Sequence, residues 1–319
     1  MNKTEDVINL IRSQSAYRFL ILTHSNPDGD AVASSIALSL MLKTLNIAND
    51  VLFDNKGIDA FKFLPGFNTI SYQIKELSLY KVVIALDTAH PDRLFIPDVF
   101  RSNSQFSVNI NLDHHMSNTQ FAKINLVEDI SSIGELLYRL FTEFQWAITP
   151  EIAGCLYASI LSDTGGFRYA NTTAQTLQIA SELINLGADN VLLAKHTFES
   201  KPFEIFKMIQ LALDNLVVNW DLGFCYTVLP KINSDYGQEI IDFIRQLDKI
   251  NICIVFREYD DRLVRISLRS KNKFDVARFA SQFEGGGHKA AAGIKMKGTL
   301  AEAVSKVIYQ LQTQLIQLS

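Results

Sequence analysis

The most informative segment of this sequence is Leu22-Thr-His24-Ser-Asn-Pro-Asp28-Gly-Asp30-Ala-Val-Ala-Ser-Ser35. Residues 18–23 form a short apolar run that predicts a buried strand, and residues 31–45 are apolar and rich in small side chains, as in a helix. The Asn-Pro-Asp-Gly sequence between them is typical of a tight turn. Open α/β sheets carry their functional groups at the carboxyl ends of strands, so this order predicts such a sheet with a site at the turn.

Three side chains of this turn are candidate metal ligands: His24, Asp28 and Asp30. Imidazole nitrogen and carboxylate oxygen are the donors expected around Mn²⁺ or Mg²⁺, and a soft-metal site would need thiolates instead. The alternative is a loop without a metal, in which Asp30 caps the following helix. The turn alone leaves both interpretations open.

Length and composition indicate a globular protein of two domains. The chain has 319 residues, of which 48% are apolar and 20% charged. We find no apolar run of about 18 residues and no apolar signal-peptide core near the first residue, so no membrane segment is expected. Three cysteines in apolar surroundings, without a CxxC pair, indicate reduced thiols and a cytoplasmic protein: Cys155, Cys225 and Cys253.

The charge is distributed unevenly along the chain. A net charge of −4 argues against a protein that coats long nucleic acids. Residues 251–297 nevertheless contain ten Lys and Arg against five Asp and Glu, an excess of +5 that leaves −9 for the remainder. An acidic body with a basic C-terminal segment suits a metal site paired with an anion-binding domain.

The order of predicted elements divides the chain into three parts. Strands alternate with helices across residues 1–186, which predicts an α/β domain with a doubly wound, mostly parallel sheet. Residues 187–222 are expected to form a helical connector. Short β-like runs and helices follow, so residues 223–319 are expected to fold as a smaller α+β domain.

Further polar residues lie at the ends of predicted elements. Asp87 follows a continuous apolar run typical of a strand buried on both faces, and Asp163 follows a helix at a Thr-Gly-Gly turn. A charge at such a position must face solvent or find a partner. The alternative for both is an ordinary turn or capping aspartate.

Asp113-His114-His115 ends another predicted strand. Adjacent side chains of an extended chain point to opposite faces, so the two histidines should have different roles. One can ligate a metal while the other faces substrate, and Asp113 can fix the tautomer of a ring from behind. A polar loop with incidental histidines is the alternative.

Four carboxylates in one place would repel each other strongly unless cations separate them. Two divalent ions would balance four negative charges, and one carboxylate, for which Asp87 is our candidate, would then bridge them. Two such ions form a clamp suited to phosphoester hydrolysis. The predicted metal ligands are His24, Asp28, Asp30, Asp87, His114 and Asp163.

The basic C-terminal segment contains two candidate anion-binding motifs. Alternation in Leu263-Val-Arg-Ile-Ser-Leu-Arg269 places Arg265, Ser267 and Arg269 on one face of a strand, where guanidinium and hydroxyl groups can bind phosphate. Gly285-Gly-Gly287 would let backbone amides approach an anion, next to His288. The alternatives are a sheet edge with solvated arginines and a flexible glycine turn.

These motifs, in this order, resemble the DHH phosphoesterase superfamily. The N-terminal matches are His-x-Asn-Pro-Asp-Gly-Asp-Ala at 24–31, the strand-end Asp87, Asp113-His114-His115 and Ser162-Asp163-Thr-Gly. Ser267-Leu-Arg-Ser270 and the Gly285–Gly293 segment resemble the DHH-associated domain of that superfamily. Many relatives carry an arginine where this chain has Ala290-Ala-Ala292.

The resemblance implies one ion on His24, Asp28 and Asp87, and a second on Asp30, Asp87, His114 and Asp163, with His115 facing the scissile phosphate. His115, Asp87 and His114 are then the expected catalytic residues. Mn²⁺ is the expected metal, with Mg²⁺ or Co²⁺ as alternatives. The expected substrate contacts are Arg265, Ser267, Arg269, Gly286, Gly287 and His288, together with Arg168 beside the metal loop.

The length and two-domain layout are similar to those of the NrnA-like members, oligoribonucleases and 3′-phosphoadenosine 5′-phosphate phosphatases. We therefore predict a cytoplasmic phosphohydrolase acting on short RNA oligonucleotides, linear dinucleotides such as pApA and 3′-phosphoadenosine 5′-phosphate. A homodimer is expected from the family. The alternatives are a cyclic-dinucleotide phosphodiesterase and a catalytically inactive nucleotide-binding module.

Overall fold

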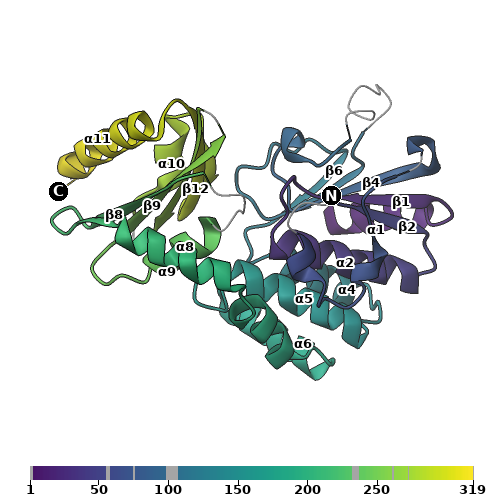
Figure 1. The fold of residues 1–319 in the computed structure, drawn as a ribbon. Coiled ribbons are helices and arrows are strands. Elements are labelled where there is room, and N and C mark those ends of the chain that lie inside the picture. Colours follow the sequence, from purple (N-terminus) through teal and green to yellow (C-terminus); the bar gives the residue numbers. More distant parts are fainter. Residues whose placement is uncertain are drawn as a thin grey trace. The chain divides into compact units, whose positions relative to one another are not determined.

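The chain folds into two compact units, Met1–Ser200 and Lys201–Ser319 (Figure 1). The structure, a computed structural model, describes residues 3–54, 58–74, 76–97, 107–231, 237–260, 262–271 and 273–318. The first unit carries all six predicted metal ligands, and the second carries the basic segment.

A parallel six-stranded sheet forms the centre of the first unit, in the order β3-β2-β1-β4-β5-β6. All neighbouring strands in this sheet run parallel. The predicted α/β fold with a mostly parallel sheet is confirmed. The strands are β1 (Arg18–Leu22), β2 (Asn49–Leu52), β3 (Ile70–Ser71), β4 (Tyr80–Leu86), β5 (Ile110–Asp113) and β6 (Ile124–Val127).

Both faces of this sheet are covered, which explains why its central strands are apolar throughout. One face, with Phe19 and Ile84, packs against helices in the main core. The other face, with Leu20 and Val83, packs against loop residues such as Phe95. The helical elements are α1 (Lys3–Ser13), α2 (Gly29–Thr44), α4 (Ile133–Glu143), α5 (Pro150–Asp163), α6 (Ala174–Asn185) and α7 (Asn190–Ala194), the 3₁₀ turns Ile58–Phe61, Phe67–Thr69, Leu77–Leu79 and Pro91–Arg93, and a π-helical turn at Lys195–Glu199.

The small residues at the start of α2 allow close helix packing. A Cβ atom on Gly29 would lie 2.3 Å from Ser162 Oγ, so glycine lets the first turn of α2 approach the end of α5. This approach brings Asp163, the last residue of α5, beside the β1–α2 loop.

The β1–α2 loop lies where the strand order reverses, because β2 and β3 are added on one side of β1, and β4, β5 and β6 on the other side. From β1 the chain crosses to β2 on one side, and β4 pairs with the other side of β1. Ligands of open α/β sheets bind outside the carboxyl ends of strands at such a switch point. The residues that follow β1, β4 and β5 therefore meet at one edge of the sheet.

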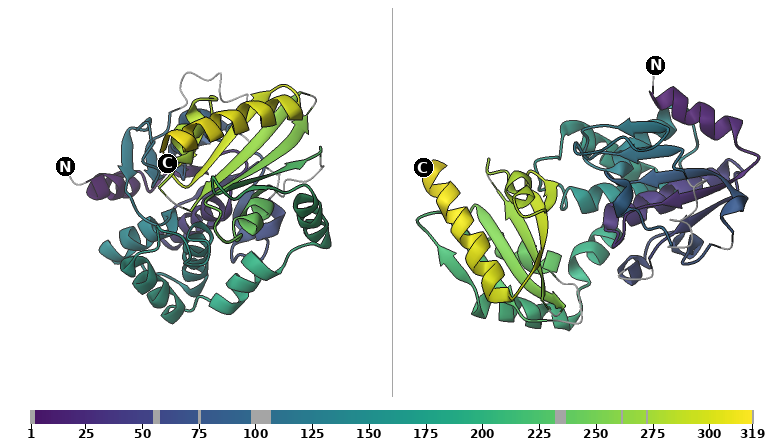
Figure 2. Two further views of the ribbon diagram at one scale, coloured as in Figure 1. Left: turned by 90° about the vertical axis from the view of Figure 1, so that its left-hand side faces the viewer. Right: turned by 90° about the horizontal axis from the view of Figure 1, so that it is seen from above.

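The second unit contains a mixed six-stranded sheet with helices on both faces (Figure 2). Its order is β11-β12-β10-β9-β8-β7, and β8–β9 is a parallel pair while the other pairs are antiparallel. The elements are α8 (Phe203–Asp214), β7 (Val217–Asn219), β8 (Phe224–Leu229), α9 (Gly237–Ile244), β9 (Ile252–Asp260), β10 (Leu263–Ser270), α10 (Val276–Ser281), β11 (Gly286–His288), β12 (Ala291–Lys297) and α11 (Leu300–Leu318).

The segment 187–222, expected to be a helical connector, is only partly helical. The helical residues before Ser200 are separated from α8 by Pro202, which caps α8 and has no backbone N–H to continue a helix. Strand β7 then begins at Val217. Within the described residues, no helix has both the length and the apolar composition required to cross a bilayer.

Candidate metal centre

The loop between β1 and α2 holds its two aspartates in different ways. Asn26 has a left-handed φ of 56°, a conformation that asparagine tolerates. Asp28 caps α2, because its Oδ1 accepts the backbone N–H of Ala31 at 3.1 Å. Asp30 lies within the first turn of α2 and is fully buried. The alternative in which Asp30 caps the helix is therefore wrong.

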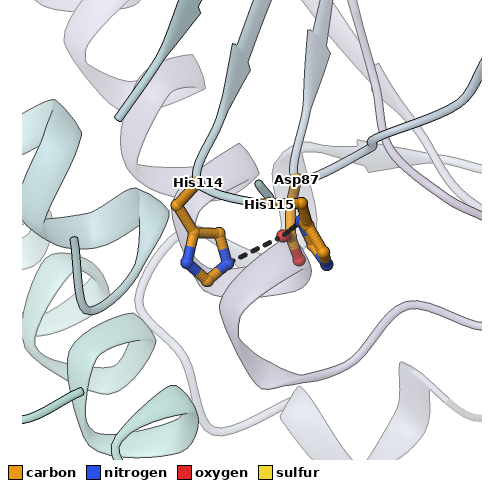
Figure 3. A group of neighbouring side chains, drawn as sticks. All are labelled: Asp87, His114 and His115. Atoms are coloured by element: carbon orange, nitrogen blue, oxygen red, sulfur yellow. Dashed lines mark ion pairs between the residues drawn. The ribbon is translucent and has the colours of Figure 1, made fainter. Parts of the chain in front are cut away.

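Asp87 follows β4 and lies between two histidines. Its Oδ1 is 3.3 Å from His114 Nε2 (Figure 3). Its Oδ2 is 3.6 Å from His24 Nε2. The backbone of Asp87 has a φ of 51°, a left-handed value that aspartate tolerates better than most residues. Its Oδ1 is buried and has no hydrogen-bond partner among the described residues. A cation would satisfy this oxygen.

The two histidines after β5 are oriented by different partners. His114 Nδ1 lies 3.3 Å from the carbonyl oxygen of Ile130, and His115 Nδ1 lies 2.7 Å from Asp113 Oδ1. Both partners accept hydrogen bonds, so each ring carries its proton on Nδ1 and leaves Nε2 for another group. Asp113 thus lies directly behind His115.

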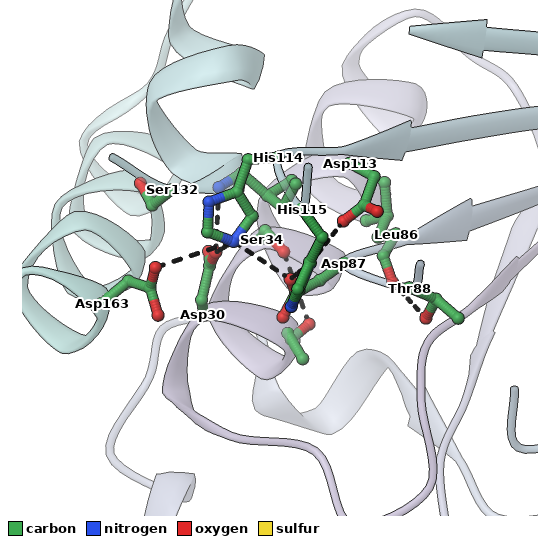
Figure 4. A network of polar contacts seen from close by, with 12 residues as sticks. Asp30, Ser34, Leu86, Asp87, Thr88, Asp113, His114, His115, Ser132 and Asp163 are labelled. Carbon is green, nitrogen blue, oxygen red and sulfur yellow. Dashed lines mark hydrogen bonds and ion pairs between the residues drawn. The ribbon is translucent and has the colours of Figure 1, made fainter. Parts of the chain in front are cut away.

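Asp30 and Asp163 approach His114 from two helices (Figure 4). His114 Nε2 is 3.8 Å from Asp30 Oδ2 and 3.6 Å from Asp163 Oδ2. Asp163 ends α5, and the glycines at 165 and 166 take positive φ values of 57° and 70° that turn the chain away. Three ligand atoms from distant parts of the sequence therefore meet around one point.

The structure brings all six predicted metal ligands together. Their candidate ligand atoms form groups in which all atoms lie within 4.8 Å of one another. Two of these groups match the two ligand sets that the family resemblance implies, except that the second group lacks the bridging Asp87. The groups are His24 with Asp28 and Asp87, Asp30 with His114 and Asp163, and Asp87 with His114 and His115.

The pKa values in this cluster are strongly shifted. Burial lowers the pKa of His24, but the contact with Asp87 outweighs it and raises the pKa to about 9. Burial raises the pKa of Asp163 to about 7. Burial and the charges of Asp87 and Asp163 raise the pKa of Asp30 well above its usual value. Burial also disfavours charge on Asp87, but His114 and His24 hold its pKa well below the usual range. Such packing of buried carboxylates is favourable only with cations nearby.

The donor set fits hard divalent cations. It consists of four carboxylates and two imidazoles, the donors preferred by Mn²⁺ and Mg²⁺. The unsatisfied Oδ1 of Asp87 provides an independent observation that a cation belongs here. These residues form a candidate metal-binding site at the switch point of the sheet.

Two sequence matches decide the family. Residues 18–160 match the DHH family, N-terminal domain, and residues 221–314 match the DHHA1 domain. This chain belongs to the DHH family. The family resemblance and the expectation of a phosphohydrolase are both confirmed. Five of the six predicted metal ligands lie within the residues that match the DHH domain, and Asp163 lies three residues beyond them.

Relatives agree with this membership. A protein of Thermus thermophilus named bifunctional oligoribonuclease and PAP phosphatase NrnA is 29% identical over 306 residues, which cover 92% of this chain and 89% of that protein. An exopolyphosphatase-related protein from Bacteroides fragilis has a similar structure, with a TM-score of 0.88, 27% identity and coverage of 100% and 98% of the two chains. The RecJ–Mn²⁺ complex from Thermus thermophilus shares the fold at 12% identity, with a TM-score of 0.62 and coverage of 99% of this chain and 55% of RecJ.

Loading the DHH domain with Mn²⁺ should raise its melting temperature. A ligand at 100 times its Kd stabilises by about 2.7 kcal/mol, which corresponds to about 5–10 °C for a unit of this size. Chelation should reverse the shift, and differential scanning calorimetry measures both. Equal melting temperatures with and without Mn²⁺ would contradict a metal site here.

The affinity for Mn²⁺ should rise with pH. With a pKa of about 9, His24 carries a proton at pH 7, and a cation must displace that proton to bind. We expect the apparent affinity to increase about tenfold per pH unit between pH 7 and 9 for each proton released. Calorimetric titrations in buffers of different ionisation enthalpy count these protons, and a pH-independent affinity would refute the assignment of His24.

Arg168 is not part of the ligand cluster. Its Nε donates to the carbonyl oxygen of Gly165 at 2.5 Å, and its guanidinium lies 5.6 Å from the ring centre of Phe198. The residue therefore supports the glycine turn after Asp163. A contact of Arg168 with substrate stays a prediction.

In the DHHA1 domain, strand β10 has the predicted alternation. Val264, Ile266 and Leu268 are buried, while Arg265, Ser267 and Arg269 are partly exposed on the other face. The interpretation as a sheet edge with solvated arginines is wrong, since β10 lies between β12 and β9.

Both arginines of β10 have partners on their face of the sheet. The Arg265 guanidinium lies 3.5 Å from the ring centre of Tyr259, and Arg269 Nη1 donates to the carbonyl oxygen of Leu268 at 3.0 Å. Arg269 Nε is also 3.9 Å from Asp242 Oδ1.

Gly286 and Gly287 belong to the edge strand β11 and Gly285 directly precedes it, so the interpretation of this run as a flexible turn is wrong. A Cβ atom on Gly285 would lie 2.5 Å from the carbonyl oxygen of Gly293, and one on Gly287 would lie 2.4 Å from that of Ala291. These two glycines permit close packing on β12. A Cβ on Gly286 would have no heavy atom within 4 Å. The side chain of His288 lies outside the described residues.

Sequence reasoning missed the role of Asn118. Its Nδ2 lies 2.5 Å from Asp113 Oδ2 and 2.7 Å from Asn111 Oδ1, so it holds the carboxylate that orients His115. A polar residue shortly after His115 is the signal in the sequence, and it cannot be distinguished from an ordinary loop asparagine.

Proposed function

We propose that this protein is a metal-dependent phosphohydrolase that cleaves short oligoribonucleotides, linear dinucleotides such as pApA and 3′-phosphoadenosine 5′-phosphate to mononucleotides. The observation that carries the proposal is Asp87, which faces His24 with one carboxylate oxygen and His114 with the other. A carboxylate in this position suits a bridge between two ions. Two Mn²⁺ ions are our assignment, with Mg²⁺ or Co²⁺ as alternatives.

When bound, two such ions supply charge stabilisation for phosphoryl oxygens and acidify water. The ligands of one would be His24, Asp28 and Asp87, and those of the other Asp30, Asp87, His114 and Asp163. His115 lies beside this cluster, with its Nδ1 proton held by Asp113. Its Nε2 would face a phosphoryl oxygen or the leaving oxygen of the substrate.

Two observations support short oligonucleotides and small nucleotides as substrates. The Thermus thermophilus relative, matched over nearly its whole length, is named an oligoribonuclease and PAP phosphatase. Residues 251–297 carry a local excess of positive charge within a chain of net charge −4. Such a distribution suits capture of a short anion and disfavours tracking along a polymer.

A substrate panel with added Mn²⁺ tests the proposal. The panel contains pApA, a five-nucleotide RNA, cyclic di-AMP, 3′-phosphoadenosine 5′-phosphate, pyrophosphate and polyphosphate. We expect turnover of the linear nucleotides with the cyclic one spared. Preferred turnover of cyclic di-AMP would indicate a signalling phosphodiesterase, and preferred turnover of polyphosphate would indicate an exopolyphosphatase. No turnover of any compound would indicate an inactive nucleotide-binding module.

Gly286→Ala tests whether β11 contacts the substrate. The added methyl group has no neighbour within 4 Å, so the fold should be unchanged. If a phosphate approaches this backbone, KM should rise about tenfold with kcat unchanged, a loss of roughly 1.4 kcal/mol of uniform binding. Gly154→Ala is the matched control, because its Cβ would make an ordinary contact 3.6 Å from Pro65 Cγ. An unchanged KM in Gly286→Ala would remove this glycine from the binding face.

We assign the protein to the cytoplasm because its three cysteines are free thiols, and two of them, Cys225 and Cys253, have sulfur atoms 3.6 Å apart without a bond. The homodimer expected from the family stays a prediction, which sedimentation velocity would test.

A further inference from the structure

The first turn of α4 donates its backbone N–H groups to the metal centre. Ile133 N–H donates to Asp30 Oδ2 at 2.9 Å, and Gly134 N–H donates to Ser159 Oγ at 2.7 Å. The N-terminus of a helix has unpaired N–H groups and partial positive charge, so it stabilises an anion. Here the anion is the side chain of Asp30, which enters from a different helix.

Ser159 connects this helix to the other oxygen of the same carboxylate. Its hydroxyl accepts from Gly134 and donates to Asp30 Oδ1, and the residue is fully buried in α5. Both oxygens of Asp30 are therefore held, one by Ser159 and the other by Ile133. This arrangement leaves Asp30 Oδ2 directed toward His114 Nε2 at 3.8 Å.

Helices α4 and α5 pack closely where Gly134 meets Ser159. A Cβ atom on Gly134 would lie 2.3 Å from Ser159 Oγ and 2.6 Å from the carbonyl oxygen of Leu156. A glycine at this position lets the two helices approach closely enough for the hydroxyl to reach both partners.

The other two ligands of the same group are also connected to residues 130–134. His114 Nδ1 lies 3.3 Å from the carbonyl oxygen of Ile130. Asn171 Nδ2 donates to the carbonyl oxygens of Ser131 at 3.0 Å and of Asp163 at 3.1 Å. One short segment thus positions Asp30, His114 and Asp163 together.

The ligands of the other group are held within their own loop. His24 Nδ1 lies 3.1 Å from the carbonyl oxygen of Ser25, and Asp28 caps α2 through Ala31. Among the described residues, no hydrogen bond or ion pair joins them to the start of α4. The two groups therefore have different structural supports and share Asp87 as a neighbour.

We propose that Ser159 is a positioning residue for one of the two ions, the one bound by Asp30, His114 and Asp163. Its hydroxyl fixes the Asp30 carboxylate at the N-terminus of α4, and the ion bound by His24 and Asp28 does not depend on it. The inference rests on the proposed two-ion centre. Loss of a partner that orients a metal ligand typically weakens metal affinity about 10–100-fold.

Ser159→Ala in the full chain tests this inference, with Mn²⁺ titrated into metal-stripped protein by calorimetry and by electron paramagnetic resonance. We expect one of the two wild-type binding events to weaken about 10–100-fold while the other is unchanged. The spin-coupled signal of paired Mn²⁺ ions should then require more metal. Ser39→Ala is the matched control, because Ser39 is a buried serine of α2 that donates to Asn49 Oδ1 at 2.7 Å, and both binding events should be unchanged.

Two unchanged binding events in Ser159→Ala would overturn the inference, and so would equal weakening of both, which a general loss of structure would cause. If Ser159→Ala does not fold, Asn171→Ala tests the inference instead. This variant removes the connection of Asp163 to residues 130–134, and it should lower the affinity for the ion bound by Asp30, His114 and Asp163. A wild-type protein that binds fewer than two ions would refute the proposed centre itself, and this result is visible before any variant is compared.

Discussion

Replacing Asp87 with alanine should release both ions and reduce kcat/KM by about 10³-fold or more, since metal charge stabilisation supplies several kcal/mol and each 1.36 kcal/mol is a factor of ten. The reason is the position of this carboxylate, 3.6 Å from His24 Nε2 through one oxygen and 3.3 Å from His114 Nε2 through the other. Removing it takes a ligand from both ions and leaves two buried imidazoles without the carboxylate that lies between them.

The experiment compares Asp87→Ala, Asp87→Asn and a control, each stripped of metal and reloaded with Mn²⁺. Metal content is measured by mass spectrometry and activity with pApA. Asp87→Asn keeps the shape and removes the charge, so it should also lose metal. Asp59→Ala is the control, because this carboxylate is 73% exposed and forms an ion pair with the neighbouring surface residue Lys62. Two ions bound to Asp87→Ala with wild-type affinity would mean that another carboxylate forms the bridge.

The central fold could be predicted because its physical causes are local. The apolar run that becomes β4 is buried on both faces of a parallel sheet, and the polar residue after it lies at the carboxyl end of the strand. The same reasoning located Asp87 and His114. Since such strand ends meet at one edge of the sheet, listing the polar residues there was sufficient to assemble the cluster.

The interactions that hold the cluster in place could not be predicted from local sequence. Ser159 is 129 residues away from Asp30, and Asn171 is 40 residues away from Ser131, so only the packing of α4 and α5 reveals these pairs. Ser132-x-x-Glu135 has the sequence spacing of a capping box, but only half of the box forms, for the same reason. Ser132 Oγ accepts the backbone N–H of Glu135 as expected, but the Glu135 carboxylate accepts hydrogen bonds from Ser131 and from a residue of α6 instead of returning to the cap.

Glycines were the least reliable signal in the second unit. A run of three glycines is typical of a flexible turn and of an anion-binding loop, and the local sequence cannot separate these from an edge strand. The structure shows that Gly285 and Gly287 are required by close packing against β12. Gly286 alone in this run leaves space for a ligand, which is why it is the position chosen for a test.

His115→Ala should leave both ions bound and lower kcat about 10²–10⁴-fold, the range expected for loss of a general acid or base. Two observations argue that this ring serves the substrate. Its Nδ1 is committed to Asp113 at 2.7 Å, and its side chain is 14% exposed, more than that of His114 at 7%. Nε2 lies on the opposite edge of the ring from Asp113, and the ring lies at the border of the buried cluster.

A competing assignment makes His115 a metal ligand, since a nitrogen of its ring groups with ligand atoms of Asp87 and His114 within 4.8 Å. Metal content separates the two roles, because a ligand variant loses an ion whereas a substrate-facing variant retains both and loses turnover. His90→Ala is the matched control, because His90 is 49% exposed in its side chain and should change neither quantity. Asp113→Asn extends the test: the amide nitrogen can donate to Nδ1 and shift the ring proton to Nε2, so the pH dependence of kcat should change while both ions stay bound. Loss of an ion in His115→Ala would move this histidine into the ligand set and leave the substrate phosphate to other groups.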